Sequence, residues 1–356
     1  MNTLIANLRL HSQQLVLPQY HTAKDIAEWM GAMQAQDCNM AKWAVGIRLR
    51  NCHLKDVESA LDKGAILRTH VLRPTWHFVS SENIRWMLAL SAKHIITAIR
   101  SRDRELGITE DVYSKTNDII IKSLEGGRNL TREALSEIIE RHGLVVNYAR
   151  ISHFLMRAEA EGIICSGIMQ DNSHTYALLD ERVPARQALS KEEALATLAT
   201  TYFSSHGPAT FADYVWWSGL SISDARKGLE DSRHKLYELK SNGNTYWMSE
   251  QFARNVSVEQ AVMHLLPAYD EYIISYKDRS PVLSSAMHAK VIASNGVFRP
   301  VIIVNGITGG IWKRSASSEK TVSIDFFDYF ADITQGRMLH DAIDAYKVFI
   351  ERKTPS

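Results

Sequence analysis

The stretch that decides the fold is Thr131–Leu179, TREALSEIIERHGLVVNYARISHFLMRAEAEGIICSGIMQDNSHTYALL. Its apolar residues recur at helical spacing up to Gly143 and again up to Gly162, and two short apolar runs around a polar turn follow. The first pattern predicts helices and the second predicts a hairpin. Preceded by an apolar-periodic helix over Asn117–Leu124, this order of three helices and a hairpin predicts a winged helix.

Capping residues indicate where these helices begin and end. Thr131 is the expected N-cap of the first helix and Asn129 the alternative, because a side-chain oxygen there accepts a hydrogen bond from an unpaired backbone amide. Gly143 stands where a helix C-terminus favours glycine. The next helix, Tyr148–Glu161, has one apolar stripe. Its opposite stripe carries Arg150, His153 and Arg157. Basic residues on such a helix are candidates for phosphate contacts.

The same order of elements recurs on both sides of this unit, which predicts three tandem modules. The third copy has predicted helices and strands at 192–205, 211–218, 223–230, 235–240 and 245–248. The first copy has them at 24–34, 40–50, 54–64, 66–72 and 75–80, followed by an added basic helix over 81–106. The domain boundaries expected from these repeats are 1–116, 117–186 and 187–258, with a C-terminal domain over 259–356.

The C-terminal domain has a different pattern. Two Asn-Gly pairs, at Asn295–Gly296 and Asn305–Gly306, lie among β-branched runs, and this dipeptide favours tight hairpin turns. They predict a meander with strands over 289–293, 297–304, 307–313 and 321–327, closed by a helix over 337–352. The predicted fold class is therefore α+β, with three winged helices followed by a β-barrel-like domain.

Composition narrows the class of protein. The 356 residues are 45% hydrophobic, which suffices for the cores of two to four domains. Cys38, Cys52 and Cys165 show no C-x-x-C spacing and predict free thiols rather than a disulfide framework or a four-thiolate metal site. The first eighteen residues are too polar for a signal peptide, and no apolar run could span a bilayer. We therefore expect a soluble, cytoplasmic protein.

The net charge of +1 does not by itself indicate nucleic-acid binding. Residues 40–104, however, hold twelve Lys and Arg against five Asp and Glu. This local excess fits an anion-binding face, although a solvated helical surface would have a similar composition. Winged helices also serve as protein-interaction modules, so the fold leaves a DNA surface and a protein-binding surface open as alternatives.

Two short stretches carry amide and imidazole groups that could do chemistry. Gln34-Ala35-Gln36 lies at the end of the first predicted helix, where two amides can converge on one water molecule. Two surface glutamines are the alternative, which the residues alone favour. His77, in Arg73–His77 of the first wing, could contact phosphate, act in catalysis or be a buried histidine bonded to the backbone. Burial is the commonest outcome in an apolar strand.

Other chemistries find little support in the sequence. Opposite charges in His264–Asp270 and Tyr276–Arg279 predict structural ion pairs first and a phosphate contact second. No nucleotide-binding glycine loop, serine-hydrolase elbow or zinc-protease motif occurs, so we expect no cofactor and no metal. Buried packing is the expectation for the adjacent Trp216 and Trp217.

Several of these stretches together resemble the AlkZ/YcaQ family of bacterial DNA glycosylases. They are Gln34–Gln36, Leu72–His77, Leu265–Asp270, Tyr276–Arg279 and Arg299–Trp312. The resemblance covers essentially the whole chain, and its first, third and fifth motifs are specific in combination. The fold that it implies, three tandem winged helices with a β-barrel-like domain, agrees with the repeats.

The resemblance implies base excision repair of alkylated double-stranded DNA, by hydrolysis of the N-glycosidic bond of N7-alkylated purines, including those in interstrand crosslinks. We expect the protein to act as a monomer and to associate with the nucleoid during repair. One branch of the family carries Q-aliphatic-Q and the other Q-aliphatic-D, so this chain resembles the AlkZ branch. Gln34 and Gln36 would then be the catalytic pair. The residues expected to bind DNA or support the site are Arg73, Thr75, His77, Arg150, Arg157, Asp270 and Arg279.

The implied chemistry is physically consistent. Glutamine is no useful base, but it can orient water beside the anomeric carbon as positive charge develops there. An N7-alkylated purine is cationic and leaves as a neutral base, so no general acid is required. No lysine nucleophile is evident near Gln34, which predicts a monofunctional enzyme. The rival hypotheses are a non-catalytic DNA-binding protein, either a transcription regulator or a lesion binder, and a protein-interaction scaffold.

Overall fold

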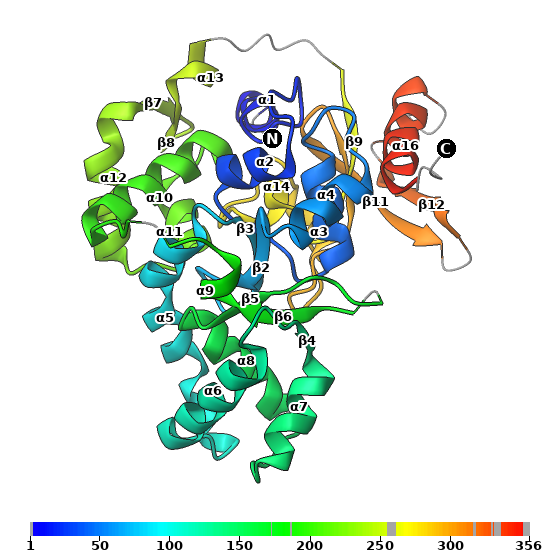
Figure 1. Cartoon of the computed structure of the whole chain (residues 1–356). Helices are drawn as coiled ribbons and strands as arrows, with labels where there is room; N and C mark the ends of the chain where they lie inside the picture. The colour runs from blue at the N-terminus through cyan, green and yellow to red at the C-terminus, as the bar shows by residue number, and fades with distance from the viewer. Residues whose placement is uncertain are drawn as a thin grey trace. The chain divides into compact units, whose positions relative to one another are not determined.

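The computed structural model of the chain describes residues 3–171, 173–185, 187–254, 261–315, 318–328, 330 and 336–351. The chain forms two compact units, the first from Met1–Glu58 with Leu195–Ser356 and the second from Ser59–Ala194. Helices alternate with small antiparallel sheets along the chain (Figure 1), which confirms the α+β class. None of the helices within these described ranges is long and apolar enough to cross a membrane.

The second unit contains the stretch from which the fold was predicted. Its helices are α5 (Ile84–Glu105), α6 (Glu110–Leu124), α7 (Arg132–Arg141), α8 (Tyr148–Ala160) and α9 (Leu179–Arg182). Its strands are β2 (Ile66–His70), β3 (Trp76–Ser80), β4 (Leu130–Thr131), β5 (Ile164–Ser166) and β6 (Thr175–Leu178). One sheet has the order β4-β6-β5, and β2 pairs with β3 as an antiparallel hairpin.

Local signals set the ends of these helices as the sequence predicts. The hydroxyl of Thr131 accepts a hydrogen bond from the amide of Ala134 at 3.2 Å, so Thr131 is the N-cap of α7. Asn147 caps α8 in the same way. The apolar faces of α6, α7 and α8 close a core around fully buried residues such as Phe154. The observed α6 begins seven residues earlier than the predicted helix over 117–124.

The first unit repeats the three-helix-and-hairpin order after its N-terminal segment. The helices are α10 (Lys191–His206), α11 (Phe211–Ser218) and α12 (Ile222–Ser232), a 3-10 turn η1 (Arg233–Lys235) follows, and the hairpin strands are β7 (Leu236–Ser241) and β8 (Asn244–Ser249). Thr210 forms a capping box with Asp213 at the start of α11. The short helix α13 (Glu250–Arg254) follows the hairpin.

The C-terminal part contains an open antiparallel sheet with the order β12-β11-β10-β9. Its elements are β9 (Met263–Leu266), α14 (Glu271–Ile274), η2 (Ser285–Met287), α15 (His288–Val291), β10 (Val301–Val304), β11 (Ile307–Ser315), β12 (Ser318–Phe326) and α16 (Arg337–Ile350). The predicted Asn305–Gly306 turn is confirmed, since both residues have the positive φ that such a hairpin turn requires.

Two predictions for this sheet are wrong. Among the strands that the structure describes, β9 and β12 are the edges and do not pair with each other, so the expected β-barrel-like closure is absent. Residues 289–293 begin within α15 instead of forming a strand, because only a single bridge, Ile292 to Phe298, pairs there. Residue 352 of the predicted closing helix lies outside the described residues.

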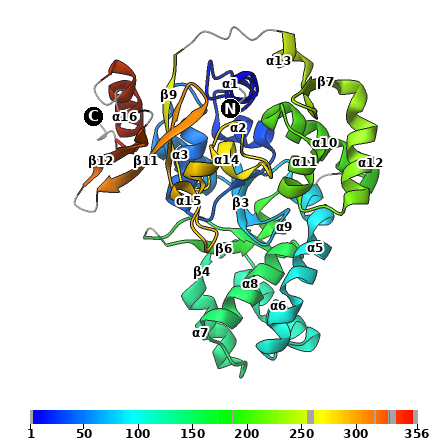
Figure 2. The same cartoon turned by 180° about the vertical axis from the view of Figure 1, so that it is seen from behind.

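The N-terminal segment of the first unit carries α1 (Thr3–Ser12), α2 (Ala23–Met30), β1 (Met33–Gln34), α3 (Cys38–Gly46) and α4 (Leu54–Asp62). Helix α3 packs on the C-terminal elements, with the Trp43 ring 5.0 Å from that of Phe349 on α16. The indole nitrogen of Trp43 also donates to the carbonyl of Leu265 on β9 at 2.7 Å. Seen from behind in Figure 2, α16 lies beside β12, against which it also packs.

The contact of α3 with α16 requires a glycine at position 46. A Cβ atom added to Gly46 would stand 2.3 Å from the Phe349 ring. We expect Gly46→Ala to lower the free energy of unfolding by about 1–3 kcal/mol, because the ring and its helix must move aside. Urea unfolding followed by circular dichroism measures the loss. Adding Phe349→Leu should recover part of it, and an unchanged midpoint in Gly46→Ala would contradict the close approach.

Candidate active site

The Gln34–Gln36 motif lies in the connection between α2 and α3, with Gln36 in a bend, and not at the end of a helix. The predicted helix over 24–34 ends at Met30, because Gly31 adopts a φ of 76° that few other residues tolerate. Gln34 then belongs to β1, and Gln36 stands one residue before Asp37, the N-cap of α3. Gln34 is 6% exposed, whereas Gln36 is exposed. The motif therefore contains one buried glutamine and one solvent-exposed glutamine.

A buried carboxylate holds the backbone of Gln34. The amide N–H of Gln34 donates to Oε1 of Glu271, the first residue of α14, at 2.6 Å. The other oxygen of Glu271 accepts hydrogen bonds from the hydroxyl of Ser275 and from the indole nitrogen of Trp217, the latter at 3.2 Å. Glu271 is 1% exposed. A short strand is thus tied to a residue 237 positions away.

The Glu271 carboxyl stays ionised despite its burial. His206 approaches it, with Nε2 3.4 Å from Oε2. Burial raises the pKa of Glu271, but the contact with His206 and the hydrogen bonds from Ser275 and the Gln34 amide outweigh burial and lower the pKa to about 2. Burial lowers the pKa of His206, which stacks on Tyr202 with ring centroids 4.9 Å apart. At neutral pH the Glu271 side chain is therefore a carboxylate.

The neighbouring Asp270 forms a second buried contact. Its two oxygens accept hydrogen bonds from the guanidinium of Arg48 at 2.7 and 2.9 Å, a bidentate pair. Arg48 also donates to the side chain of Gln13 at 2.9 Å. Both charged side chains of the pair are 0% exposed. Asp270 was expected to form an ion pair within its own loop, but its partner lies 222 positions away, just beyond α3.

Arg279, from the same predicted set, lies beside α14. Its Nε donates to the carbonyl of Ile273 at 2.9 Å. Its guanidinium carbon lies 5.4 Å from the ring centre of Trp216 and 5.2 Å from that of Phe298. Trp216 is 43% exposed, so the expectation of buried packing holds for Trp217 alone. The adjacent tryptophans contact different parts of α14, since Trp216 donates to the carbonyl of Ile274.

The residues predicted from the first wing belong to the second unit. β3 begins at Trp76, so Arg73 and Thr75 lie in the connection between β2 and β3, and His77 lies in the strand. His77 is fully buried, and its Nδ1 is 2.9 Å from the carbonyl oxygen of Thr75. This geometry corresponds to a buried histidine bonded to the backbone, the commonest of the three outcomes considered.

Arg150 and Arg157 of α8 are engaged within the second unit. Each is 9% exposed. Arg150 donates to backbone carbonyls, including that of Val145 at 2.8 Å. Arg157 forms ion pairs with Glu110 at 2.7 Å and with Glu161 at 2.6 Å. Their guanidinium groups therefore already hold protein partners, which favours the supporting role over a phosphate contact.

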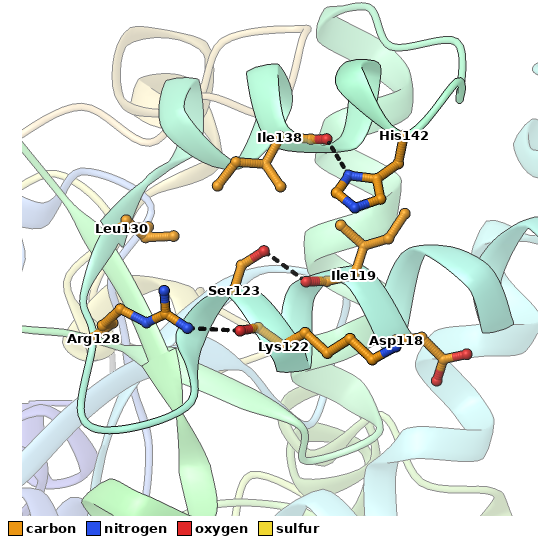
Figure 3. Close-up of a pocket in the computed structure, with 8 residues that line it drawn as sticks. All are labelled: Asp118, Ile119, Lys122, Ser123, Arg128, Leu130, Ile138 and His142. Carbon is orange, nitrogen blue, oxygen red and sulfur yellow. Dashed lines mark hydrogen bonds between the residues drawn. The ribbon is translucent and has the colours of Figure 1, made fainter.

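A pocket of about 380 Å³ opens between α6 and α7 in the second unit (Figure 3). Lys122, Arg128 and His142 line it, and Arg128 donates to the backbone carbonyl of Lys122 at 2.8 Å. The pocket contains none of the predicted site residues. In the described part of the chain, no group of three or more His, Cys, Asp and Glu residues is arranged to hold a metal ion.

Sequence reasoning missed three residues of the first unit that the geometry singles out. They are Arg48, His206 and Glu271. Glu271 had a signal, because it directly follows Asp270 and precedes the apolar Tyr272–Ile274, and a charge beside such a run must be paired if buried. Arg48 and His206 had none, since their partners come from distant parts of the chain.

Comparison with known proteins identifies relatives of the chain. Residues 27–349 match the family model described as DNA glycosylase AlkZ-like. The solved structure of Streptomyces sahachiroi DNA glycosylase AlkZ is similar to this chain with a TM-score of 0.80 and 20% identity, covering 99% of this chain and 98% of that chain. No curated protein sequence matches the chain. At this identity the structural likeness shows a shared fold.

Proposed function

The chain belongs to the AlkZ-like family of DNA glycosylases, and we propose that it hydrolyses the N-glycosidic bond of N7-alkylated purines in double-stranded DNA, with Gln34 and Gln36 orienting the attacking water. The observation that carries the proposal is the Gln34–Gln36 segment, whose backbone is held by the Glu271 carboxylate at 2.6 Å. A water-orienting amide needs a fixed position more than it needs basicity.

The position of the two glutamines outside a helix supports a joint role for them. Gln34 lies in β1 and Gln36 in the bend before α3, so the two side chains are not forced apart as residues i and i+2 of a helix would be. Gln34 is buried and Gln36 is exposed to solvent, so water can reach the motif at Gln36. Two amides can bind one water molecule, because each offers an acceptor oxygen and two donor hydrogens.

Amide chemistry restricts the substrates. A neutral amide cannot protonate a leaving base, so the base must carry its own positive charge, as an N7-alkylated purine does. The purines at the ends of an N7-linked interstrand crosslink carry the same charge, and we propose that they are substrates too. With water as the nucleophile, the enzyme is monofunctional. We propose that it acts as a monomer on chromosomal DNA during base excision repair.

The order of elements supports three winged helices, over 1–116, 117–186 and 187–258, followed by a β-rich domain over 259–356. The second has the helices α6, α7 and α8 with the sheet β4-β6-β5. The third has α10, α11 and α12 with the β7–β8 hairpin, and the first has α2, α3 and α4 followed by the β2–β3 hairpin. Three helices followed by a β-ribbon are typical of the winged-helix module.

For the remaining site residues we propose two roles. Arg73, which is partly exposed in the connection of the first wing, contacts the DNA backbone, because wings present basic residues to phosphates, whereas Thr75, whose hydroxyl is buried, supports that connection. The other residues support the fold of the unit in which each lies, through their contacts with neighbouring protein groups. They are His77, Arg150, Arg157, Asp270 and Arg279.

The experiment that tests the function is release of 7-methylguanine from methylated duplex DNA. We expect the wild type to release the base and Gln34→Ala/Gln36→Ala to release it at least about 100-fold more slowly, because the water loses its orientation. DNA binding by the double variant should stay within about twofold. Absence of release by the wild type, alongside DNA binding, would instead support a transcription regulator or a lesion binder.

Salt dependence distinguishes DNA binding from protein binding. We expect the affinity of the wild type for a 20-base-pair duplex to fall steeply between 50 and 200 mM salt, by about tenfold or more, because phosphate contacts release counterions. Fluorescence anisotropy measures the slope, and Arg73→Ala should make it shallower. An affinity that does not respond to salt would contradict a phosphate-binding surface and favour the interaction-scaffold hypothesis.

A further inference from the structure

The position of Gln34 depends on a residue far away in the sequence. Gln34 lies in a two-residue strand between the turn at Gly31 and helix α3, so no helical hydrogen bond fixes its amide. That amide donates to Oε1 of Glu271 at 2.6 Å. The Glu271 carboxylate therefore anchors the Gln34 backbone at its amide, and with it the origin of the Gln34 side chain.

Glu271 is itself immobilised. It is the first residue of α14, capped by the Asp270 side chain, which accepts a hydrogen bond from the amide of Tyr272. Its second oxygen is held by Ser275 from within the same turn and by Trp217 from α11. With 1% of the residue exposed, water cannot replace these donors. The carboxylate is thus a rigid acceptor.

The adjacent carboxylate holds the other end of the same segment. Arg48, two residues beyond the end of α3, is bound by Asp270 through two hydrogen bonds of 2.7 and 2.9 Å. The stretch from Gln34 to Arg48 contains both glutamines and the whole of α3. Consecutive acidic residues of the Leu265–Glu271 stretch therefore anchor this segment at both ends.

We propose that Glu271 is a positioning residue for base release: through the Gln34 amide it fixes the place from which the Gln34 side chain orients water. This inference rests on the proposed function of Gln34. Glu271 does not touch the substrate in this proposal and moves no proton. Glu271 therefore affects the rate of the chemical step and not the affinity for DNA. The effect on the rate is large, because displacement of a water-orienting group by about 1 Å suffices to slow a reaction about 100-fold.

The test compares single-turnover release of 7-methylguanine by Glu271→Gln, Glu271→Ala and Tyr272→Phe. Gln keeps one oxygen for the Gln34 amide but loses an acceptor for Ser275 and Trp217, so we expect an about tenfold slower rate. Ala leaves the amide without its acceptor and should be about 100-fold slower. The matched control is Tyr272→Phe, on the same helix, which loses only the hydroxyl contacts to Ala6 and Gly306.

All variants are measured at a temperature where circular dichroism shows them folded, together with their affinity for the methylated duplex. The inference is supported if the rate falls in the order wild type, Gln, Ala, while the affinity and the rate of Tyr272→Phe stay within about twofold of wild type. It is overturned if Glu271→Gln and Glu271→Ala release base at the wild-type rate, if Tyr272→Phe is equally slow, or if the loss lies in affinity alone.

Gln34→Ala separates this inference from the proposed function. If Gln34→Ala is slow and the Glu271 variants are as fast as wild type, the catalytic role of Gln34 stands and the positioning role of Glu271 fails. If Gln34→Ala releases base at the wild-type rate, or if the wild type releases none, the proposed function fails and the positioning role fails with it.

Discussion

Replacing Arg48 by methionine is expected to lower the free energy of unfolding of the protein by about 3–5 kcal/mol. Arg48 is the bidentate partner of Asp270, and both side chains are 0% exposed. Methionine keeps much of the apolar volume but leaves the Asp270 carboxylate buried without its counter-charge. The loss appears as a lower midpoint in urea unfolding at pH 7, monitored by circular dichroism.

Two further variants identify the cause of this loss. Lys24→Met removes one partner of an exposed pair with Glu28, in which both side chains are 37% exposed, and should change stability by less than about 1 kcal/mol. Arg48→Met/Asp270→Asn removes the buried charge and should recover part of the loss. If Arg48→Met proves no less stable than Lys24→Met, the buried pair does not hold the segment in the way we describe.

Acid should remove a contribution of about 3 kcal/mol that the Glu271 carboxylate makes to stability. The pKa of Glu271 is lowered from 4.5 to about 2, so the native state binds this proton less readily than the unfolded chain. The contribution is therefore complete above about pH 5 and is lost as the pH falls from there toward 2. It concerns a fully buried group, which solvent does not screen.

The difference between wild type and Glu271→Gln isolates this contribution from the other carboxylates. At pH 6 the wild type should be more stable by about 3 kcal/mol, and the gap should narrow at each lower pH at which both proteins still fold. Urea unfolding at pH 6, 5, 4 and 3.5 gives the curve. A gap that stays constant with pH would mean that the Glu271 pKa is the same in the folded and unfolded states.

Much of the helical structure could be predicted because its signals are local. The N-cap hydrogen bonds of Thr131 and Thr210 join residues three positions apart, and the Asn305–Gly306 turn requires only the conformations of its own residues. The predicted helix over 24–34 runs past the observed end of α2 at Met30, because Ala32 and Met33 continue the apolar pattern beyond Gly31. Helix α2 ends because Gly31 adopts a positive φ, which the apolar periodicity does not reveal.

By itself, the sequence determined the α+β class, the order of helices and hairpins, and the Gln34–Gln36 motif that led to the family. Tertiary structure alone decided that the C-terminal sheet stays open, that Gln34 is buried while Gln36 is exposed, and that Glu271 and Arg48 hold the segment between them. The physical reason is range. A cap or turn needs partners within about four residues, whereas the pairing of edge strands and the burial of a charge depend on partners brought together only when the chain is folded.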